Sequence, residues 1–211
     1  YSEIPERKKF VIPNPVDFSV YPERVKEGIV KRIVGVGRLK PQKNFSLLID
    51  SFALIASHHA DVKLDIYGEG TLRESLQQKI HDLRLDDRIT LRGASARVLE
   101  EIRDAAVFVM SSDFEGFPNV LVEAIAMGIP VITTDFPTGV AREIVTDQAG
   151  LIVQCGDKRG MASAIDMLLS DNALRERIRQ NGYRTIQRFE CSQVVDTRDN
   201  FFKRITVNIG D

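Results

Sequence analysis

The chain has 211 residues, of which 43% are hydrophobic and 28% are charged, and its formal net charge is −1. This length and composition suit one domain with a buried core, and the balanced charge, without a basic cluster among aromatic residues, argues against nucleic-acid binding. No apolar run reaches the roughly 18 residues that span a bilayer, and no signal peptide is recognisable. Cys155 and Cys191 fit neither a metal knuckle nor a disulfide framework, so a reducing compartment is expected.

Two segments precede the first predicted strand. Residues 10–17 form a short apolar run that ends in a Pro-Asn-Pro turn. Taken alone, this pattern is also typical of an ordinary Pro-rich linker. Residues 21–31 are charged and are predicted to be loop and solvated helix.

Six apolar runs then alternate with helical patterns, which predicts the α/β class with a Rossmann-like, mainly parallel sheet flanked by helices. The predicted strands are residues 32–37, 62–67, 88–91, 107–110, 130–133 and 150–153. The predicted helices are residues 45–57, with Asn44 as N-cap, 71–83, 96–105, 119–127, a short one ending near 145, 157–169, 172–189 and 193–205. Loops that follow parallel strands meet at one edge of the sheet, where such folds bind ligands.

Several common functional motifs are absent. The turn Gly68-Glu69-Gly70 lacks the third glycine of a dinucleotide fingerprint and follows the second strand rather than the first. No P-loop, G-x-S-x-G or H-E-x-x-H motif is present. His58, His59 and His81 lie in or beside polar helical segments and are predicted to be exposed or capping residues.

Residues 107–145 predict one βαβ unit whose first loop can bind a ligand. Two carboxylates bracket the loop: Glu115 lies within it, and Glu123 follows eight positions later on the helix. Gly116 lets a ligand approach the backbone, and Pro118 suits a first helical turn, after which free N–H groups can bind phosphate. An anion surrounded by hydroxyls, such as a nucleotide diphosphate-sugar, needs both kinds of group.

Glu115 and Glu123 form an E-x7-E pair within E-G-F-P-N-V-L-V-E-A, followed by M-G-I-P-V-I. With these residues the chain resembles the donor-binding domain of glycosyltransferase family 4, whose members are two-domain retaining enzymes of the GT-B fold. The E-x7-E spacing alone is a weak signal. Two glutamates at this distance by chance would be one charged residue in a loop and one on a solvated helix face. The segment G-R-L-x-x-x-K-N at residues 37–44 and the Gly68 turn, in this order upstream, favour the family.

The resemblance implies a role for each site residue. Glu123 would bind the two ribose hydroxyls, and Glu115 would bind hydroxyls of the transferred sugar near the reacting carbon. Arg38 and Lys43 would stabilise the leaving diphosphate, because Arg binds two oxygens at once and Lys adds a compact charge. The implied catalytic residues are Glu115, Arg38 and Lys43. The implied donor-binding residues are Gly37, Arg38, Lys43, Gly68, Gly93, Glu115, Gly116, Phe117, Asn119, Val120, Leu121 and Glu123, with residues 92–96 near the base.

The resemblance also implies a domain organisation. Residues 1–31 would be an interdomain linker and domain entry, residues 32–190 the donor-binding domain, and residues 191–211 a C-terminal crossover helix and tail. Because the chain opens with Tyr-Ser-Glu, we expect an excised C-terminal half of a GT-B fold. It would lack the N-terminal acceptor-binding domain and bind the donor without turnover.

Relatives that resemble the P-T-G segment at 137–139 often build lipid-linked or surface polysaccharide from UDP-sugars, so a UDP-sugar is the expected donor. The expected acceptor is a glycan or a lipid-linked sugar, and the full enzyme is expected to be cytoplasmic, with peripheral contact to the inner face of the membrane as an option. No cofactor and no metal is expected, because the sequence has no D-x-D pair. One residue is shifted before Arg142 relative to the family pattern, which leaves the role of Arg142 open.

Two other classes stay open. One is a non-transferase enzyme on the same fold, such as a sugar-nucleotide epimerase or a phosphorylase, although neither a catalytic acid–base pair nor a cofactor lysine is identifiable. The other is a non-catalytic α/β binding domain, which would bind no nucleotide diphosphate.

Overall fold

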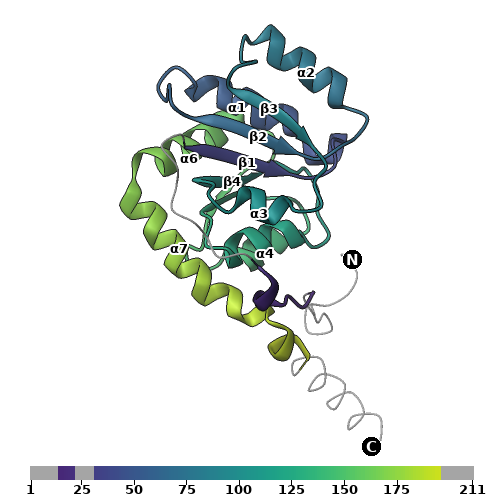
Figure 1. Ribbon diagram of the computed structural model, residues 1–211. Helices are drawn as coiled ribbons and strands as arrows, with labels where there is room; N and C mark the ends of the chain where they lie inside the picture. Colours follow the sequence, from purple (N-terminus) through teal and green to yellow (C-terminus); the bar gives the residue numbers. More distant parts are fainter. Residues whose placement is uncertain (1–13, 22–30, 196–211) are drawn as a thin grey trace, which may run out of the picture. The chain divides into compact units, whose positions relative to one another are not determined.

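The computed structural model describes residues 14–21 and 31–195, which fall into two compact units. The larger unit lies within residues 21–186 and holds the sheet and its helices (Figure 1). In the smaller unit, the short 3-10 helices η2 (Phe18–Val20) and η4 (Gln187–Phe189) flank a backbone link between the two ends of the chain. Val16 donates its N–H to the carbonyl of Phe189 at 2.8 Å and accepts the N–H of Cys191 at 3.1 Å. The predicted helix at 193–205 lies mostly outside the described residues, as do half of the segment at 10–17 and most of the segment at 21–31.

The larger unit is built on a six-stranded parallel sheet in the order β3-β2-β1-β4-β5-β6. Its strands are β1 (Arg32–Val36), β2 (Lys63–Tyr67), β3 (Ile89–Gly93), β4 (Val107–Met110), β5 (Val131–Thr134) and β6 (Leu151–Val153). The predicted fold class is therefore confirmed. The strand order changes direction between β1 and β4, and the carboxyl ends of strands on either side of such a switch point are where open sheets bind ligands.

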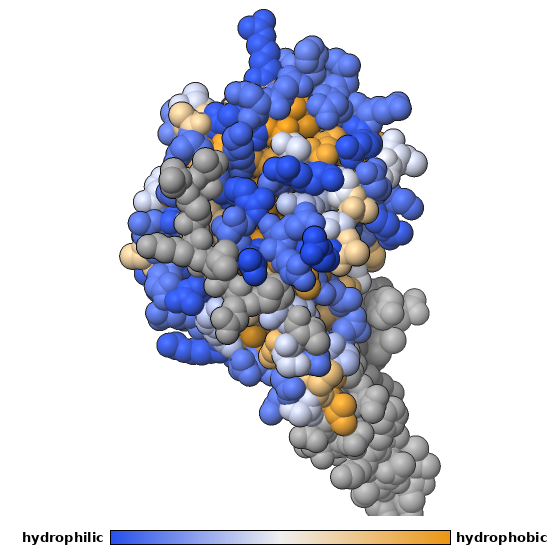
Figure 2. Space-filling view, in the orientation of Figure 1, coloured by the Kyte–Doolittle hydropathy of each residue, from blue (hydrophilic) through white to orange (hydrophobic). Residues whose placement is uncertain are grey.

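Helices cover the sheet and define its core. They are α1 (Phe45–Ile55), α2 (Arg73–Asp82), α3 (Val98–Ile102), α4 (Asn119–Ala126), α5 (Val140–Ile144), α6 (Lys158–Ser170) and α7 (Asn172–Ile186). Helix α1 packs against α2 and α6, and α4 packs against α7 (Figure 1). One buried cluster joins α1, α2 and α6 to the sheet, and Phe52, Leu64 and Ile165 are among its fully buried members. The face shown in Figure 2 is mostly hydrophilic, with apolar residues visible only in small patches.

Some predicted bounds were wrong because contacts between distant residues set them. Helix α2 starts later than residue 71, since the N–H of Leu72 donates to the carbonyl of Leu39 at 3.0 Å and holds the Gly70 turn outside the helix. Strand β3 runs on through Arg92 to Gly93, two residues that were expected in a loop. Helix α3 is shorter than residues 96–105, because a tight turn from Ala105 back to Ile102 precedes β4.

A buried carboxylate explains the longer β3. Asp65 in β2, with 1% of its side chain exposed, accepts hydrogen bonds from Arg32 of β1 at 2.8 Å and from Arg92 of β3 at 3.0 Å. Arg32 also contacts Asp104 ahead of β4. The ion pairs of Asp65 with the two arginines thus link the neighbouring strands β1, β2 and β3.

We predict that Asp65→Ala lowers the free energy of unfolding by about 3 kcal/mol, because it removes the buried carboxylate that Arg32 and Arg92 share and leaves the partly buried Arg32 guanidinium with Asp104 alone. Urea unfolding followed by circular dichroism measures this. The matched control is Asp86→Ala, which removes an exposed partner of His81 and should change the free energy by less than about 0.5 kcal/mol. Equal effects of the two substitutions would contradict a structural role for Asp65.

Candidate active site

Three glycines lie together where β1, β2 and β3 end. The N–H of Gly37 donates to the carbonyl of Tyr67 at 2.9 Å, and the N–H of Gly68 donates to the carbonyl of Gly93 at 2.7 Å. Gly68 has φ +140°, and a Cβ there would lie 1.9 Å from the carbonyl oxygen of Gly37. Only glycine fits this position, so the turn after β2 can lie directly on the loop after β1.

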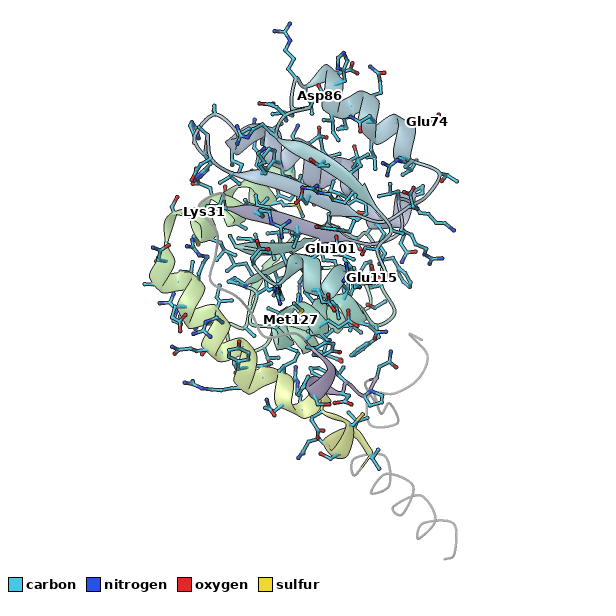
Figure 3. The ribbon with its side chains drawn as sticks, viewed as in Figure 1. Lys31, Glu74, Asp86, Glu101, Glu115 and Met127 are labelled. Atoms are coloured by element: carbon cyan, nitrogen blue, oxygen red, sulfur yellow. The ribbon has the colours of Figure 1, made fainter. Side chains whose placement is uncertain are left out.

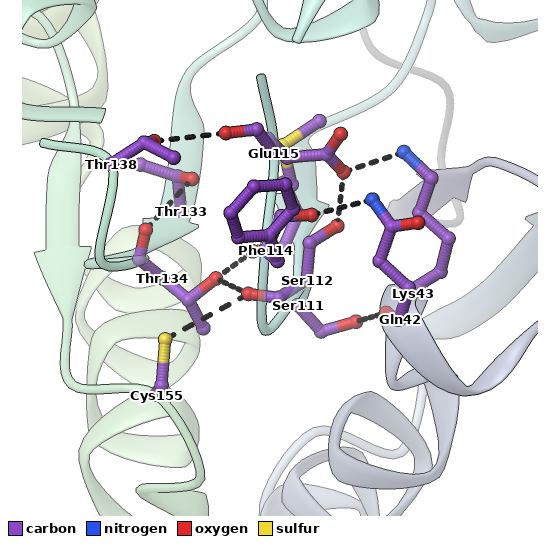
Figure 4. Close-up of polar contacts among 11 residues, drawn as sticks. Gln42, Lys43, Ser111, Ser112, Phe114, Glu115, Thr133, Thr134, Thr138 and Cys155 are labelled. Atoms are coloured by element: carbon purple, nitrogen blue, oxygen red, sulfur yellow. Dashed lines mark hydrogen bonds and ion pairs between the residues drawn. The ribbon is translucent and has the colours of Figure 1, made fainter. Parts of the chain in front are cut away.

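The loop after β1 is joined to the loop after β4. The first contains the 3-10 turn η3 (Pro41–Lys43), and the second is residues 111–118. The N–H of Asp113 donates to the carbonyl of Gln42 at 2.9 Å, while the Gln42 side chain donates to the carbonyl of Phe114 at 2.6 Å (Figure 4). The two loops therefore hold each other across the switch point.

Asn44 links the same loops to helix α1. Its side-chain oxygen accepts the N–H of Leu47 at 3.2 Å, which confirms the predicted N-cap. Its amide nitrogen donates to the carboxylate of Asp113 at 3.0 Å. Asn44 has φ 43°, a left-handed conformation that asparagine tolerates better than most residues.

Lys43 and Glu115 form an ion pair between the two loops. Lys43 Nζ lies 2.5 Å from Glu115 Oε1, and the hydroxyl of Ser112 donates to the same oxygen at 2.6 Å (Figure 4). Glu115 is 7% exposed, and it lies at the carboxyl ends of the strands, opposite Lys31, which precedes β1 (Figure 3). Its other oxygen, Oε2, accepts no hydrogen bond from the described residues. The pair leaves one carboxylate oxygen open to a ligand.

Glu123 is a half-buried carboxylate on α4. Burial raises its pKa, and among the described residues it has neither a hydrogen bond nor an ion pair. Arg38, by contrast, is exposed, and its guanidinium also lacks a partner in the described part of the chain. A desolvated carboxylate and an unpaired cation near one sheet edge are typical of a ligand site.

Residues 22–185 match the family model described as Glycosyl transferases group 1. The chain belongs to this family. It is 32% identical over 176 residues to the N-acetylgalactosamine-N,N'-diacetylbacillosaminyl-diphospho-undecaprenol 4-alpha-N-acetylgalactosaminyltransferase of Campylobacter jejuni, covering 82% of this chain and 47% of that one. It is 33% identical over 161 residues to the capsular polysaccharide biosynthesis glycosyltransferase CapM of Staphylococcus aureus, covering 76% of this chain and 42% of that one. The chain thus spans less than half the length of these two relatives.

Solved structures show the same fold. A crystal structure of Staphylococcus aureus TarM in complex with fondaparinux, alpha-GlcNAc-glycerol and UDP superposes with a TM-score of 0.81 at 25% identity, over 92% of this chain and 39% of that one. The C-terminal domain of the group 1 glycosyl transferase LpcC from Francisella tularensis superposes with a TM-score of 0.70 at 26% identity, over 82% of this chain and 96% of that one. These likenesses agree with the Rossmann-like sheet of GT-B glycosyltransferases.

One expectation about this group 1 domain was wrong. The start of α4 was expected to present a row of free N–H groups, but the N–H of Asn119 donates to the carbonyl of Phe117 at 3.1 Å and that of Leu121 donates to Pro118 at 3.0 Å. The tight first turn forms these bonds, and Pro118 is the N-cap rather than a helical residue. Of the three expected amides, Val120 alone has no backbone acceptor in the described residues. The backbone at Gly116 is open, since a Cβ there would meet no atom within 4 Å.

The side chain of Arg142 is paired with Asp135. Its guanidinium donates to the carboxylate of Asp135 at 2.9 Å, and this hydrogen bond lowers the pKa of Asp135.

The histidines take no part in the site. His59 forms a hydrogen bond with Asp166 of α6 at 2.6 Å, and 15% of its side chain is exposed, so His59 is more buried than expected. Among residues 14–21 and 31–195, no three His, Cys, Asp or Glu side chains could jointly hold a metal ion. No helix in that part of the chain is long and apolar enough to cross a membrane.

Sequence reasoning missed three residues that support Glu115. They are Ser112, Gln42 and Thr138, whose hydroxyl donates to the carbonyl of Glu115 at 2.8 Å. The S-x-x-E spacing of Ser112 and Glu115 is a signal for a local hydrogen bond and could have indicated the first. The other two lie 73 and 23 positions from Glu115 in the sequence, and no local pattern points to them.

We predict that Glu123→Gln raises the free energy of unfolding at pH 7 by about 0.5 kcal/mol or more, as substitutions that relieve a functional cost do. Burial disfavours the charged form of Glu123, so its raised pKa means that wild-type stability falls as the pH rises through that pKa. The gain should shrink as the pH is lowered toward 4, because protonation of the wild-type carboxyl removes the cost of burying its charge. Denaturant unfolding at both pH values measures this.

The control is Glu143→Gln, an exposed glutamate on α5, which should change stability little at either pH. A Glu123→Gln variant that is less stable than wild type at pH 7 would show that the carboxylate supports the fold.

Proposed function

We propose that this chain is the donor-binding domain of a retaining glycosyltransferase that transfers a sugar from a UDP-sugar to a glycan or a lipid-linked acceptor. The observation that carries the proposal is the direct contact of Lys43 with Glu115 at the switch point, with the unpaired Arg38 in the same loop. A donor of this class has two charged phosphates next to a ring of hydroxyls. This edge of the sheet offers cations and a carboxylate oxygen within one cluster.

Each group has a role in this proposal. Arg38 and Lys43 bind the diphosphate and stabilise the charge that grows on it as the bond to the sugar breaks. Glu115 offers Oε2 to the hydroxyls of the transferred sugar, and Glu123 accepts the two ribose hydroxyls. The backbone at Gly37, Gly68 and Gly93 lets the nucleotide approach closely, and Gly116, Phe117, Asn119, Val120 and Leu121 complete the donor pocket.

The names of similar proteins support the donor and the acceptor. TarM has been solved with UDP, and the Campylobacter relative is named for transfer to a diphospho-undecaprenol-linked sugar. CapM is named for capsular polysaccharide, which is also built from sugars. Retention of configuration, and membership of family 4, are proposed from the E-x7-E resemblance. Because the chain belongs to the glycosyl transferases group 1, a non-transferase enzyme and a non-catalytic domain are set aside.

The same proposal covers the rest of the enzyme. Residues 1–31 connect to an N-terminal acceptor-binding domain, residues 32–190 hold the donor, and residues 191–211 cross back. The likeness to an isolated C-terminal domain, LpcC, over 96% of its length supports this division. The 211-residue chain alone then binds the donor without transferring its sugar, in a cytoplasmic enzyme for which peripheral contact with the membrane is an option. Sugar transfer by this chain alone would contradict that division of labour.

We predict that UDP binds this chain, whereas GDP and ADP bind more weakly, and that added magnesium leaves UDP affinity unchanged because cationic side chains meet the diphosphate. Calorimetric titration with each nucleotide, without and then with magnesium, measures this. Binding of GDP or ADP in preference to UDP would overturn the assignment of the base. A strict need for magnesium would overturn the role of Arg38 and Lys43.

We predict that Arg38→Ala weakens UDP binding by about 1–3 kcal/mol without changing the free energy of unfolding, because the guanidinium has no partner in the described residues to lose. The matched control is Arg103→Ala, another exposed arginine, which follows α3 and should leave UDP binding unchanged. Similar losses in the two variants would point to a diffuse charge effect rather than a contact with phosphate.

A further inference from the structure

The loop after β4 reverses the usual pattern of burial. Ser112 is 1% exposed and Glu115 is 7% exposed, yet Phe114 between them is 53% exposed. Folding alone favours the opposite arrangement, because an aromatic ring gains from leaving water and a carboxylate loses. The exposed ring is therefore a candidate contact for a ligand.

The backbone beneath this ring is held in place. The carbonyl of Phe114 accepts the Gln42 side chain at 2.6 Å, and the preceding residue, Asp113, donates its N–H to Gln42 at 2.9 Å. The following residue, Glu115, is fixed by Lys43 (Figure 4). A rigidly held aromatic side chain has only two rotatable bonds to order on binding, so it presents a large contact area at a low entropic cost.

The position of the ring indicates what it contacts. This step rests on the proposed function, in which the buried Glu115 carboxylate faces the transferred sugar. Phe114 and Glu115 are neighbours in the chain, with Cα atoms about 3.8 Å apart, and of the two side chains only that of Phe114 is exposed to solvent. The acceptor hydroxyl must come within about 3–3.5 Å of the reacting carbon from outside the donor pocket.

We propose that Phe114 is a positioning and specificity residue that stacks on the apolar face of a pyranose ring of the acceptor. The face of an aromatic ring carries partial negative charge, and the C–H groups on one face of a pyranose carry partial positive charge. Stacking orients the acceptor sugar over the edge of the donor site. It favours acceptors that carry a sugar ring over those that carry a simple alcohol.

The test compares Phe114→Ala and Phe114→Tyr in the 211-residue chain, with Leu54→Ala, a similarly exposed apolar residue on α1, as control. Calorimetry gives the UDP affinity, which should change less than twofold in all three variants. Saturation-transfer NMR, with UDP bound, then probes methyl α-D-glucopyranoside, methyl α-D-galactopyranoside and glycerol. We expect a saturation-transfer signal from at least one glycoside and no signal from glycerol. The glycoside signal should be retained in Phe114→Tyr and Leu54→Ala and lost in Phe114→Ala.

Three results would overturn the inference while leaving UDP binding intact. They are glycoside signals equal in wild type and Phe114→Ala, no glycoside signal in the wild type, and equal signals from glycosides and glycerol. A fall of UDP affinity by more than fivefold in Phe114→Ala would also overturn it, by assigning the ring to the donor. Failure of the wild type to bind UDP is a separate result that contradicts the proposed function itself.

Discussion

The ion pair between Lys43 and Glu115 is the contact on which the rest of the site depends. The two side chains are only 16% and 9% exposed, so each lost most of its hydration when the chain folded, and such a pair contributes little net stability. The main effect of the ion pair is to fix the positions of the two loops. It joins the loop after β1 to the loop after β4, the two strands on either side of the switch point. The bond from Gln42 to Phe114 fixes the same junction, and Ser112 holds Glu115 within its own loop.

Other unfavourable local features lie near this junction. Glu123 loses hydration without gaining a partner among the described residues, and Asn44 adopts a left-handed conformation. A sequence selected for stability alone would remove a half-buried, unpaired carboxylate. Local rules are broken where a site needs a charge or a backbone shape, and the cost is offset by packing elsewhere. Here the offset comes from the dry cluster that α1, α2 and α6 form with the sheet.

Alternation of apolar runs and helical patterns was enough to predict all six strands and the parallel class, because burial on both faces leaves a local trace. The ends of the helices and strands were harder to predict from the sequence. Strand β3 extends because Arg92 reaches Asp65, 27 positions away, and no local pattern encodes that bond. The site followed the same rule. Motifs indicated Glu115 and Lys43 but not their contact, and the expected free amides after Pro118 were wrong because the first turn of α4 closes on itself.

In the proposed donor site, the pair would let a carboxylate and a diphosphate share one lysine. An ammonium group has three N–H donors, so Lys43 can keep its bond to Glu115 Oε1 while it binds a phosphate oxygen. Because Ser112 holds the same Oε1, the plane of the carboxylate is set before a donor arrives, and Oε2 is the oxygen left to meet hydroxyls. A group that is already oriented loses little freedom on binding and needs little rearrangement as charge develops. If the chain binds a nucleotide-sugar as proposed, the bond between the two loops orders the carboxylate before that ligand arrives.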